Sequence, residues 1–206
     1  MKPIIGISLR ITTAEKYVEK RDSLSHDWPI MLEQLGFSPL LIPNTISDIS
    51  TFLDAMKVSG LILSGGDNIG DDPLRDQTEK TIIDYAMSHN VPLIGICRGM
   101  QIINSFFGGK IRCLDNSSHV NKSHTVNFNN HFSLKNNSIQ VNSFHHNVID
   151  PTNLGRNLLP FAISELDNTV EGFFHNEFQI FGVMWHPERH PDTNSIELFK
   201  KIFSKK

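Results

Sequence analysis

A cysteine flanked by glycines, in the run Gly95-Ile96-Cys97-Arg98-Gly99, lies between an apolar segment and a helix-like one. The residues Val91–Ile94 predict a buried strand, and Met100–Phe107 predicts a helix. A tight turn between them would hold the side chain above the sheet edge, and the glycines remove side chains that would clash. The helix N-terminus would also favour a thiolate. Cys97 is therefore a candidate nucleophile, with a buried and unreactive thiol as the alternative.

A histidine and a glutamate near the other end of the chain could serve this thiol. The segment Gln179–Trp185 predicts a strand, and His186-Pro187-Glu188 follows it directly. Imidazole titrates near neutrality, so His186 can take the thiol proton and later protonate a leaving amine. Glu188 can hold that imidazole in one tautomer. Each residue alone would be ordinary on a surface, but with Cys97 they predict a catalytic triad for acyl transfer.

The elements that would position these residues alternate between strands and helices. Strand signals occur at Ile4–Leu9, Pro39–Ile42, Gly60–Leu63 and Pro92–Ile96, and helix signals at Trp28–Leu35, Ile49–Lys57 and Glu79–His89. Strands that are apolar on both sides predict a mostly parallel, doubly wound α/β sheet with helices on both faces. Shorter strands with polar turns between 111 and 184 predict antiparallel additions, and Ser195–Phe203 predicts a closing helix.

Length and composition are those of an ordinary globular enzyme. The 206 residues fit one domain, 1–206, that can bury a core without disulfides. Two cysteines, Cys97 and Cys113, are too few for a stapled secreted fold, so we expect a cytoplasmic protein. The N-terminal sequence has no signal-peptide pattern, and no apolar run approaches the ~18 residues needed to cross a membrane. A formal net charge of −3 argues against nucleic acid as a partner.

Two motifs together, Gly95–Gln101 and Gly182–Glu188, resemble the class I glutamine amidotransferase superfamily with its Cys-His-Glu triad. Within that superfamily the chain resembles the peptidase C26 branch of γ-glutamyl hydrolases. The opening Lys2–Ser8, the loop Leu63–Asn68 and the segment Val141–His146 match this branch in the same order. The resemblance implies a flavodoxin-like α/β fold and hydrolysis of an amide through a glutamyl thioester.

The resemblance also implies a set of binding groups. Backbone N–H groups are the best oxyanion donors because they are already fixed, and here the implied pair is Gly66 and Arg98. Gln101 lies one helical turn beyond Cys97 on the same face, and the resemblance implies that it holds the glutamyl group. Ser143 and Phe144 would present backbone groups to the α-amino and α-carboxylate ends.

The histidines His145 and His146 belong to the same matched segment. The resemblance implies that one of them lines the pocket, without saying which, and a structural hydrogen bond is the alternative for either.

Basic residues follow the first predicted strand. Arg10, Lys16, Lys20 and Arg21 are interspersed with acidic residues, which is typical of a solvated face. In a doubly wound sheet, however, this segment lies at the carboxyl ends of the strands, where ligands bind. Arg10 and Arg21 are therefore candidates for binding an anionic leaving group, such as a phosphate or nucleotide.

Ten histidines raise the question of a metal. The combinations that could contribute ligands are His119 with His124, His145 with His146, and His186 with His190. The two cysteines are far apart and no H-E-x-x-H motif is present, so we expect neither a metal nor another cofactor.

The sequence thus predicts a stand-alone γ-glutamyl amide hydrolase acting on a small-molecule conjugate. One alternative is the glutaminase subunit of an amidotransferase, which would pass ammonia to a synthase partner. Another is a non-catalytic or redox-sensing relative. The oligomeric state, including a homodimer, stays open.

Overall fold

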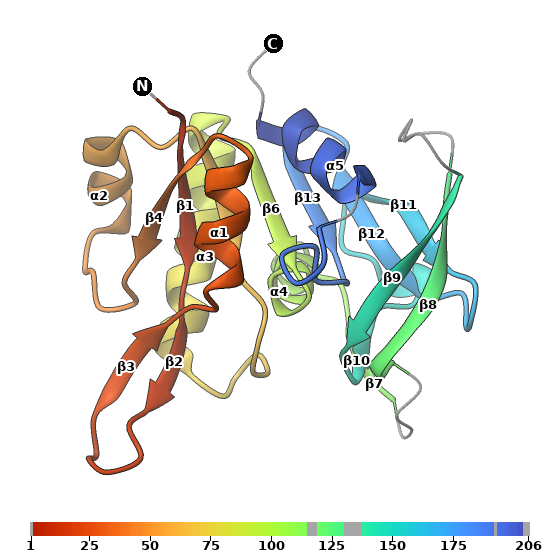
Figure 1. The fold of residues 1–206 in the computed structure, drawn as a ribbon, viewed down its shortest axis with the longest axis horizontal. Coiled ribbons are helices and arrows are strands. Elements are labelled where there is room, and N and C mark those ends of the chain that lie inside the picture. Colours follow the sequence, from red (N-terminus) through yellow and green to blue (C-terminus); the bar gives the residue numbers. More distant parts are fainter. Residues whose placement is uncertain (1, 115–118, 130–136, 192, 204–206) are drawn as a thin grey trace.

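The computed structural model describes residues 2–114, 119–129, 137–191 and 193–203. One sheet of nine strands forms its centre, in the order β4-β1-β5-β6-β13-β12-β11-β8-β9 (Figure 1). The strand bounds are Ser38–Ile42 for β4, Ile4–Ser8 for β1, Gly60–Leu63 for β5, Leu93–Ile96 for β6, Ile180–Val183 for β13, Val170–His175 for β12, Leu158–Ser164 for β11, Val120–Phe128 for β8 and Ser138–Phe144 for β9.

The sheet has a parallel half and an antiparallel half. The strands β4, β1, β5, β6 and β13 pair in parallel, and we call them the parallel half. The strands β12, β11, β8 and β9 continue the same sheet by antiparallel pairing and are called the antiparallel half. The predicted α/β class is confirmed. The later strands extend the central sheet itself.

Helices cover both faces of the parallel half. Their bounds are Asp27–Gln34 for α1, Ile49–Met56 for α2, Pro73–His89 for α3, Arg98–Phe106 for α4 and Thr193–Phe203 for α5. Helices α1 and α5 lie on one face, where the rings of Trp28 and Phe199 are 6.3 Å apart (Figure 1). Helix α3 lies on the opposite face. Strands β5 and β6 are buried along their whole length, which explains their continuous apolar sequence.

Two features of the fold differ from the sequence-based expectation. Helix α3 begins at Pro73, earlier than the predicted Glu79, because Asp72 accepts a hydrogen bond from the Leu74 amide as its N-cap. The segment after β1, expected to be a loop, forms a hairpin of β2 (Arg10–Thr13) and β3 (Lys20–Ser23). Its strands are mostly exposed and polar, so they lack the apolar alternation that would have revealed them.

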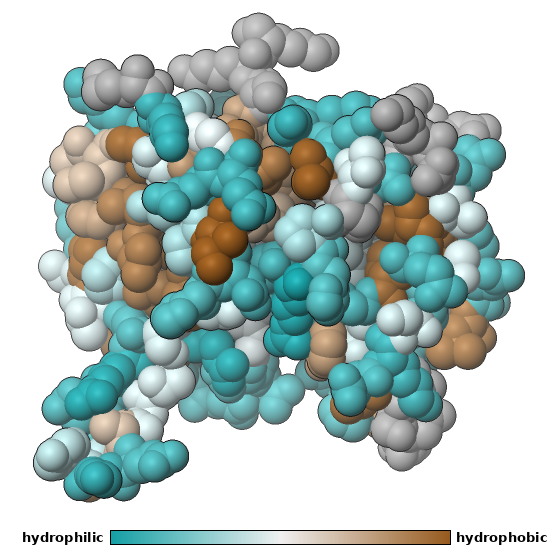
Figure 2. Space-filling view, in the orientation of Figure 1, coloured by the Kyte–Doolittle hydropathy of each residue, from teal (hydrophilic) through white to brown (hydrophobic). Residues whose placement is uncertain are grey.

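The β2–β3 hairpin projects from the end of the sheet, and Figure 2 shows that its surface is largely hydrophilic. Smaller elements complete the described chain, namely the pair β7 (Arg112–Cys113) and β10 (Asn147–Val148) and the 3-10 turn Pro151–Asn153. Among the described residues, no helix is both long and apolar enough to cross a membrane.

Candidate active site

Cys97 lies on the turn that joins β6 to α4, in a backbone conformation that few non-glycine residues adopt. Its φ is 52° and its ψ is −104°, which costs of order 1–3 kcal/mol and is typical of functional sites. The glycines around it permit the close approach of backbone to backbone. A Cβ on Gly95 would lie 2.4 Å from the carbonyl carbon of Gly99, and one on Gly99 would lie 2.1 Å from the carbonyl oxygen of Leu63. The turn is therefore a nucleophile elbow in geometry as well as in sequence.

His186 follows β13, the strand that neighbours β6. Val183 pairs with Ile96 in parallel register, and the Cys97 amide donates to the Val183 carbonyl at 2.8 Å. Because the two strands share one hydrogen-bonded ladder, the side chains that follow them lie close together. The structure thus brings Cys97 and His186 to the same edge of the sheet.

Glu188 orients the imidazole from the side away from the sulfur. Its Oε1 lies 2.7 Å from Nδ1 of His186, and both residues are buried. Burial opposes protonation of the ring, but hydrogen bonds to Cys97 and Glu188 outweigh it and raise the pKa of His186 to about 9. An imidazolium at this position can serve as a proton donor.

Asn142, which the sequence analysis did not single out, fixes the backbone of the histidine. Its Nδ2 donates to the His186 carbonyl and its Oδ1 accepts from the His186 amide, both at 2.8 Å. The ring of Phe144 meets the imidazole edge-on, with centroids 5.8 Å apart. Strand β9 therefore contributes to the position of a residue that follows β13. A lone asparagine among many others in this part of the sequence gave no signal of this role.

The two candidate oxyanion donors come from different elements: Gly66 from the loop after β5, and Arg98 from the first residue of α4. Gly66 has a φ of 98°, which favours glycine. A Cβ on Gly65 would lie 2.8 Å from Cε1 of His186, so this loop lies directly against the imidazole. Among the described residues, no hydrogen-bond acceptor is assigned to the amides of Gly66 or Arg98. Both residues line the same cavity as Cys97, which is where the donors of an oxyanion hole would have to lie.

A buried ion network supports this loop from below. Arg75 donates to the carbonyl oxygens of Ser64 and Gly65 at 2.9 and 3.0 Å, and its Nε donates to Glu79 at 3.0 Å. The Arg98 guanidinium forms ion pairs with Glu79 and Asp76. The side chain of Arg98 is thus structural, while the residue also lines the cavity beside Cys97. Arg75 carried no signal in the sequence, because a single arginine on a helix resembles a solvated one.

A cavity of about 190 Å³ opens beside Cys97, and we call it the thiol cavity. Gln101 and Phe144, both expected to bind the glutamyl group, line it together with Asn147. Ser143 lies behind the wall, where its hydroxyl donates to the His119 carbonyl at 2.6 Å. Its side chain is therefore engaged elsewhere.

Both histidines of the predicted pair line the thiol cavity, although in different states. His145 is buried, with Nδ1 3.0 Å from the Asn147 carbonyl, and burial lowers its pKa to about 4. His146 is exposed. The sequence left open which of the two lines the pocket. In the structure both do, His145 as a buried residue and His146 as an exposed one.

A second cavity of about 250 Å³ lies on the other side of Gly66 and His186, and we call it the arginine cavity. Arg10 and Arg189 both line it. Arg10 forms an ion pair with Asp67 at 2.6 Å, and the Arg189 guanidinium lies 4.1 Å from the centroid of the Phe144 ring. Arg189 was not expected from the sequence, although it directly follows the His-Pro-Glu motif.

The two predicted basic residues of the hairpin are separated by the structure. Arg10 lies against the donor loop, since a Cβ on Gly66 would be 2.5 Å from its Nε. Arg21 pairs instead with Glu19 at 2.7 Å, and it lines neither the thiol cavity nor the arginine cavity.

Known proteins resemble this chain in sequence and in fold. The sequence model of the peptidase C26 family matches residues 3–188. The chain is 34% identical to the gamma-glutamyl-CDP-amidate hydrolase of Campylobacter jejuni, over 97% of both chains. It is 27% identical to a glutamine-hydrolysing GMP synthase subunit of Methanobrevibacter smithii, over 90% of this chain and 92% of that one. The crystal structure of a putative GMP synthase subunit from Thermoplasma acidophilum superimposes with a TM-score of 0.75 at 25% identity, covering 98% of this chain and 93% of that one.

Proposed function

This chain belongs to the peptidase C26 family, and on that premise we propose that it hydrolyses a γ-glutamyl amide through a thioester on Cys97. The observation that carries the proposal is that Cys97, His186 and Gln101 line one cavity, with Glu188 at 2.7 Å from the imidazole. A thiolate, a proton donor and an orienting carboxylate are the groups that acyl transfer requires.

The proposed reaction has two steps. The Cys97 sulfur attacks the γ-carbonyl carbon, and the oxyanion is stabilised by the amides of Gly66 and Arg98. His186 gives its proton to the departing nitrogen as the carbon–nitrogen bond breaks. Water then attacks the thioester and gives a proton to His186, which releases glutamate and restores the thiolate. Glu188 keeps Nδ1 of the imidazole engaged throughout, so that Nε2 faces the sulfur and the leaving group.

The arginine cavity supports a leaving group that carries phosphate. It lies across His186 from the thiol cavity, where an amine would depart, and it offers the guanidinium groups of Arg10 and Arg189. The 34% identical relative is named for a γ-glutamyl-CDP-amidate. We therefore propose γ-glutamyl-CDP-amidate as the substrate and glutamate and cytidine diphosphoramidate as the products, as a step in bacterial capsule modification.

Steady-state kinetics with three substrates would test this proposal. Glutamate release is measured with γ-glutamyl-CDP-amidate, with a γ-glutamyl amide of an uncharged amine, and with glutamine. We expect kcat/KM to be at least about 10²-fold higher for the nucleotide conjugate, since charge-assisted hydrogen bonds contribute about 1.5–3 kcal/mol each. Equal rates with the uncharged amide would contradict the proposed leaving group while leaving the hydrolase assignment intact.

A pair of variants in the same hairpin isolates the anion contact. Arg10→Ala should lower kcat/KM about tenfold for the nucleotide conjugate and leave the uncharged amide unaffected. Arg21→Ala removes the same charge from a side chain outside both cavities, so it should match the wild-type protein on every substrate. An equal loss in the two variants would indicate a general effect of charge on the hairpin.

The second candidate is a glutaminase subunit, which the similarity to the GMP synthase subunits favours. That function predicts slow hydrolysis of glutamine by the isolated chain and a large increase when a synthase partner is added. If glutamine were the only substrate and its hydrolysis required the partner, the glutaminase function would replace the hydrolase proposal. Rapid turnover of a γ-glutamyl conjugate by the isolated chain would exclude the glutaminase function.

A further inference from the structure

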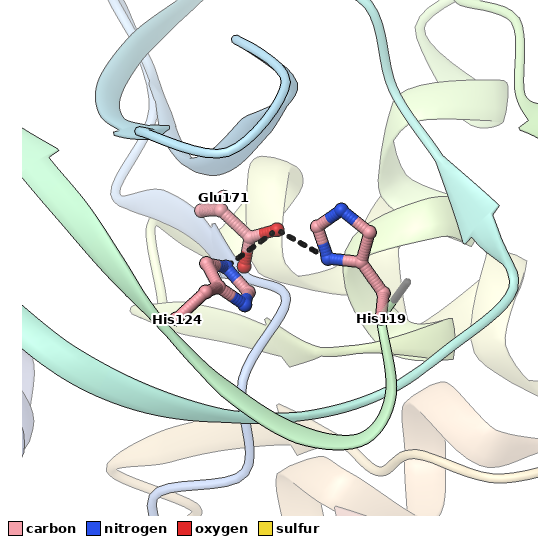
Figure 3. A group of neighbouring side chains, drawn as sticks. All are labelled: His119, His124 and Glu171. Atoms are coloured by element: carbon pink, nitrogen blue, oxygen red, sulfur yellow. Dashed lines mark ion pairs between the residues drawn. The ribbon is translucent and has the colours of Figure 1, made fainter. Parts of the chain in front are cut away.

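Behind the wall of the thiol cavity lies a buried cluster of three histidines and one glutamate, which the proposed reaction does not use. His119 precedes β8, His124 lies within β8, His145 follows β9, and Glu171 lies on β12. Their exposed fractions are 0%, 8%, 4% and 1%. Figure 3 shows His119 and His124, from just before β8 and from β8 itself, pointing toward Glu171 on β12. The antiparallel half of the sheet thus collects four potential metal ligands at one point.

The spacing of these groups suits a cation at their centre. Oε1 of Glu171 lies 3.4 Å from Nε2 of His124, 3.6 Å from Nε2 of His145 and 3.9 Å from Nδ1 of His119. These distances are long for hydrogen bonds. Ligand atoms around a tetrahedral zinc ion, each about 2.0–2.1 Å from the metal, are about 3.3 Å apart. The ligand atoms of His119, His124 and Glu171 all lie within 4.8 Å of one another, somewhat wider than a zinc coordination shell, and His145 adjoins this group at Glu171.

Within the part of the chain that the structure describes, most of the potential ligand atoms lack a hydrogen-bond partner. Among the described residues, the cluster atoms without a hydrogen-bond partner are Nδ1 of His119, both ring nitrogens of His124, Nε2 of His145 and both carboxylate oxygens of Glu171. Each unpaired buried polar group costs about 1–3 kcal/mol. Such a concentration of unpaired lone pairs, aimed at one another, is explained by a bound cation.

The outer contacts of two histidines orient their lone pairs inward. Nε2 of His119 lies 2.9 Å from Oδ2 of Asp167, so its proton is engaged there and Nδ1 is left as an acceptor. Nδ1 of His145 donates to the Asn147 carbonyl at 3.0 Å, which leaves Nε2 free toward Glu171. Metal-binding histidines almost always give their second N–H to a carboxylate or a carbonyl in this way.

We propose that His119, His124, His145 and Glu171 bind one zinc ion as a structural site. Three imidazoles and a carboxylate favour zinc over magnesium or calcium, which prefer oxygen ligands. Four protein ligands close the coordination shell, and a closed shell is typical of a structural site.

The position of the site suggests what the ion stabilises. It would join β8 and β9 to β12, and β9 carries Asn142, which holds the backbone of His186. His145 belongs both to the cluster and to the lining of the thiol cavity. The ion would therefore fix the wall of the active site and take no part in the reaction.

Metal analysis of the untagged protein tests this proposal without reference to hydrolysis. After incubation with zinc and gel filtration in zinc-free buffer, we expect about one zinc per chain by mass spectrometry of the metal. A content below about 0.1 per chain would overturn the proposal. With cobalt in place of zinc, the absorption spectrum should be that of a tetrahedral site with nitrogen and oxygen ligands; an octahedral spectrum would also count against it.

Variants assign the ligands. His124→Asn and Glu171→Gln should each lower zinc retention at least about tenfold, whereas His190→Asn, which alters an exposed histidine outside the cluster, should retain it. Circular dichroism confirms that each variant is folded, and zinc should raise the melting temperature of the wild-type protein but not of Glu171→Gln. Retention of zinc by both cluster variants would show that the metal binds elsewhere.

Discussion

Two buried glutamates, one in each half of the molecule, show how differently the halves treat buried charge. Glu79, beneath the parallel half, accepts hydrogen bonds from Ser8 and Arg75 and forms an ion pair with Arg98. Glu171, in the antiparallel half, has no hydrogen-bond donor among the described residues for either carboxylate oxygen. The buried charge of Glu79 is thus compensated by two arginines, in the network that supports the loop beside Cys97. The antiparallel half forms the cavity wall and is completed, on our proposal, by a metal.

The sharpest way to establish that the chemistry belongs to the parallel half is to remove the nucleophile. Cys97→Ala should lower kcat about 10⁴-fold or more, equivalent to about 5.5 kcal/mol. Cys113→Ala, which alters the exposed second cysteine, should have no effect. Steady-state rates of glutamate release measure both. A Cys97→Ala variant that kept the full rate would remove the assignment of Cys97 as the nucleophile.

The contrast between the two glutamates can be tested by stability. Glu79→Gln should lower the free energy of unfolding by about 3–5 kcal/mol, because it leaves two buried arginines with one fewer partner. In the presence of EDTA, Glu171→Gln should change it by less than about 1 kcal/mol, since no hydrogen bond is lost. Urea denaturation of both variants measures the difference. Equal losses of unfolding free energy in EDTA would show that the two glutamates are equally well paired in the metal-free protein.

His186 stands at the seam between the halves, and its titration can be followed. Its pKa of about 9 means that the proton donor is lost as pH rises through about 9, so kcat/KM should fall there. Glu188→Gln removes a group that raises this pKa, so the alkaline limb should move to lower pH and the rate should fall about 10²-fold. A pH–rate profile with an unchanged alkaline limb in the variant would argue against this pairing.

We expect substitutions in the antiparallel half to lower the rate by less than substitutions of Cys97 or Glu188. Asn142→Ala removes both hydrogen bonds to the His186 backbone and should lower kcat about tenfold, or about 1.4 kcal/mol. Because the residue acts through the position of the imidazole, Asn142→Ala should change kcat more than KM. A change confined to KM would indicate that Asn142 affects substrate binding instead.

The parallel half could be predicted well from sequence. Its strands are continuous apolar runs, and Cys97, His186 and Glu188 each follow such a run within a contiguous motif. The β2–β3 hairpin could not be found in this way, because exposed polar strands carry no periodic signal.

The histidine cluster could not be predicted from local sequence patterns either. Its residues lie on or beside β8, β9 and β12, and the folding of these strands into one sheet brings them together. The histidines were considered in pairs, and Glu171 had no feature to connect it with them. Networks such as Arg75 with Glu79 are hidden for the same reason, since each member alone resembles a surface residue.

The residues Cys97 and His186 follow adjacent strands of one ladder, in which Val183 pairs with Ile96. Strands in a sheet are held ~4.8 Å apart by backbone hydrogen bonds. The distance between Cys97 and His186 is therefore set by the pairing of two core strands. It does not depend on the β2–β3 hairpin, which borders the arginine cavity. As a consequence, changes in the hairpin can alter which leaving amine binds without moving Cys97 or His186, so substrate specificity can evolve separately from the chemistry.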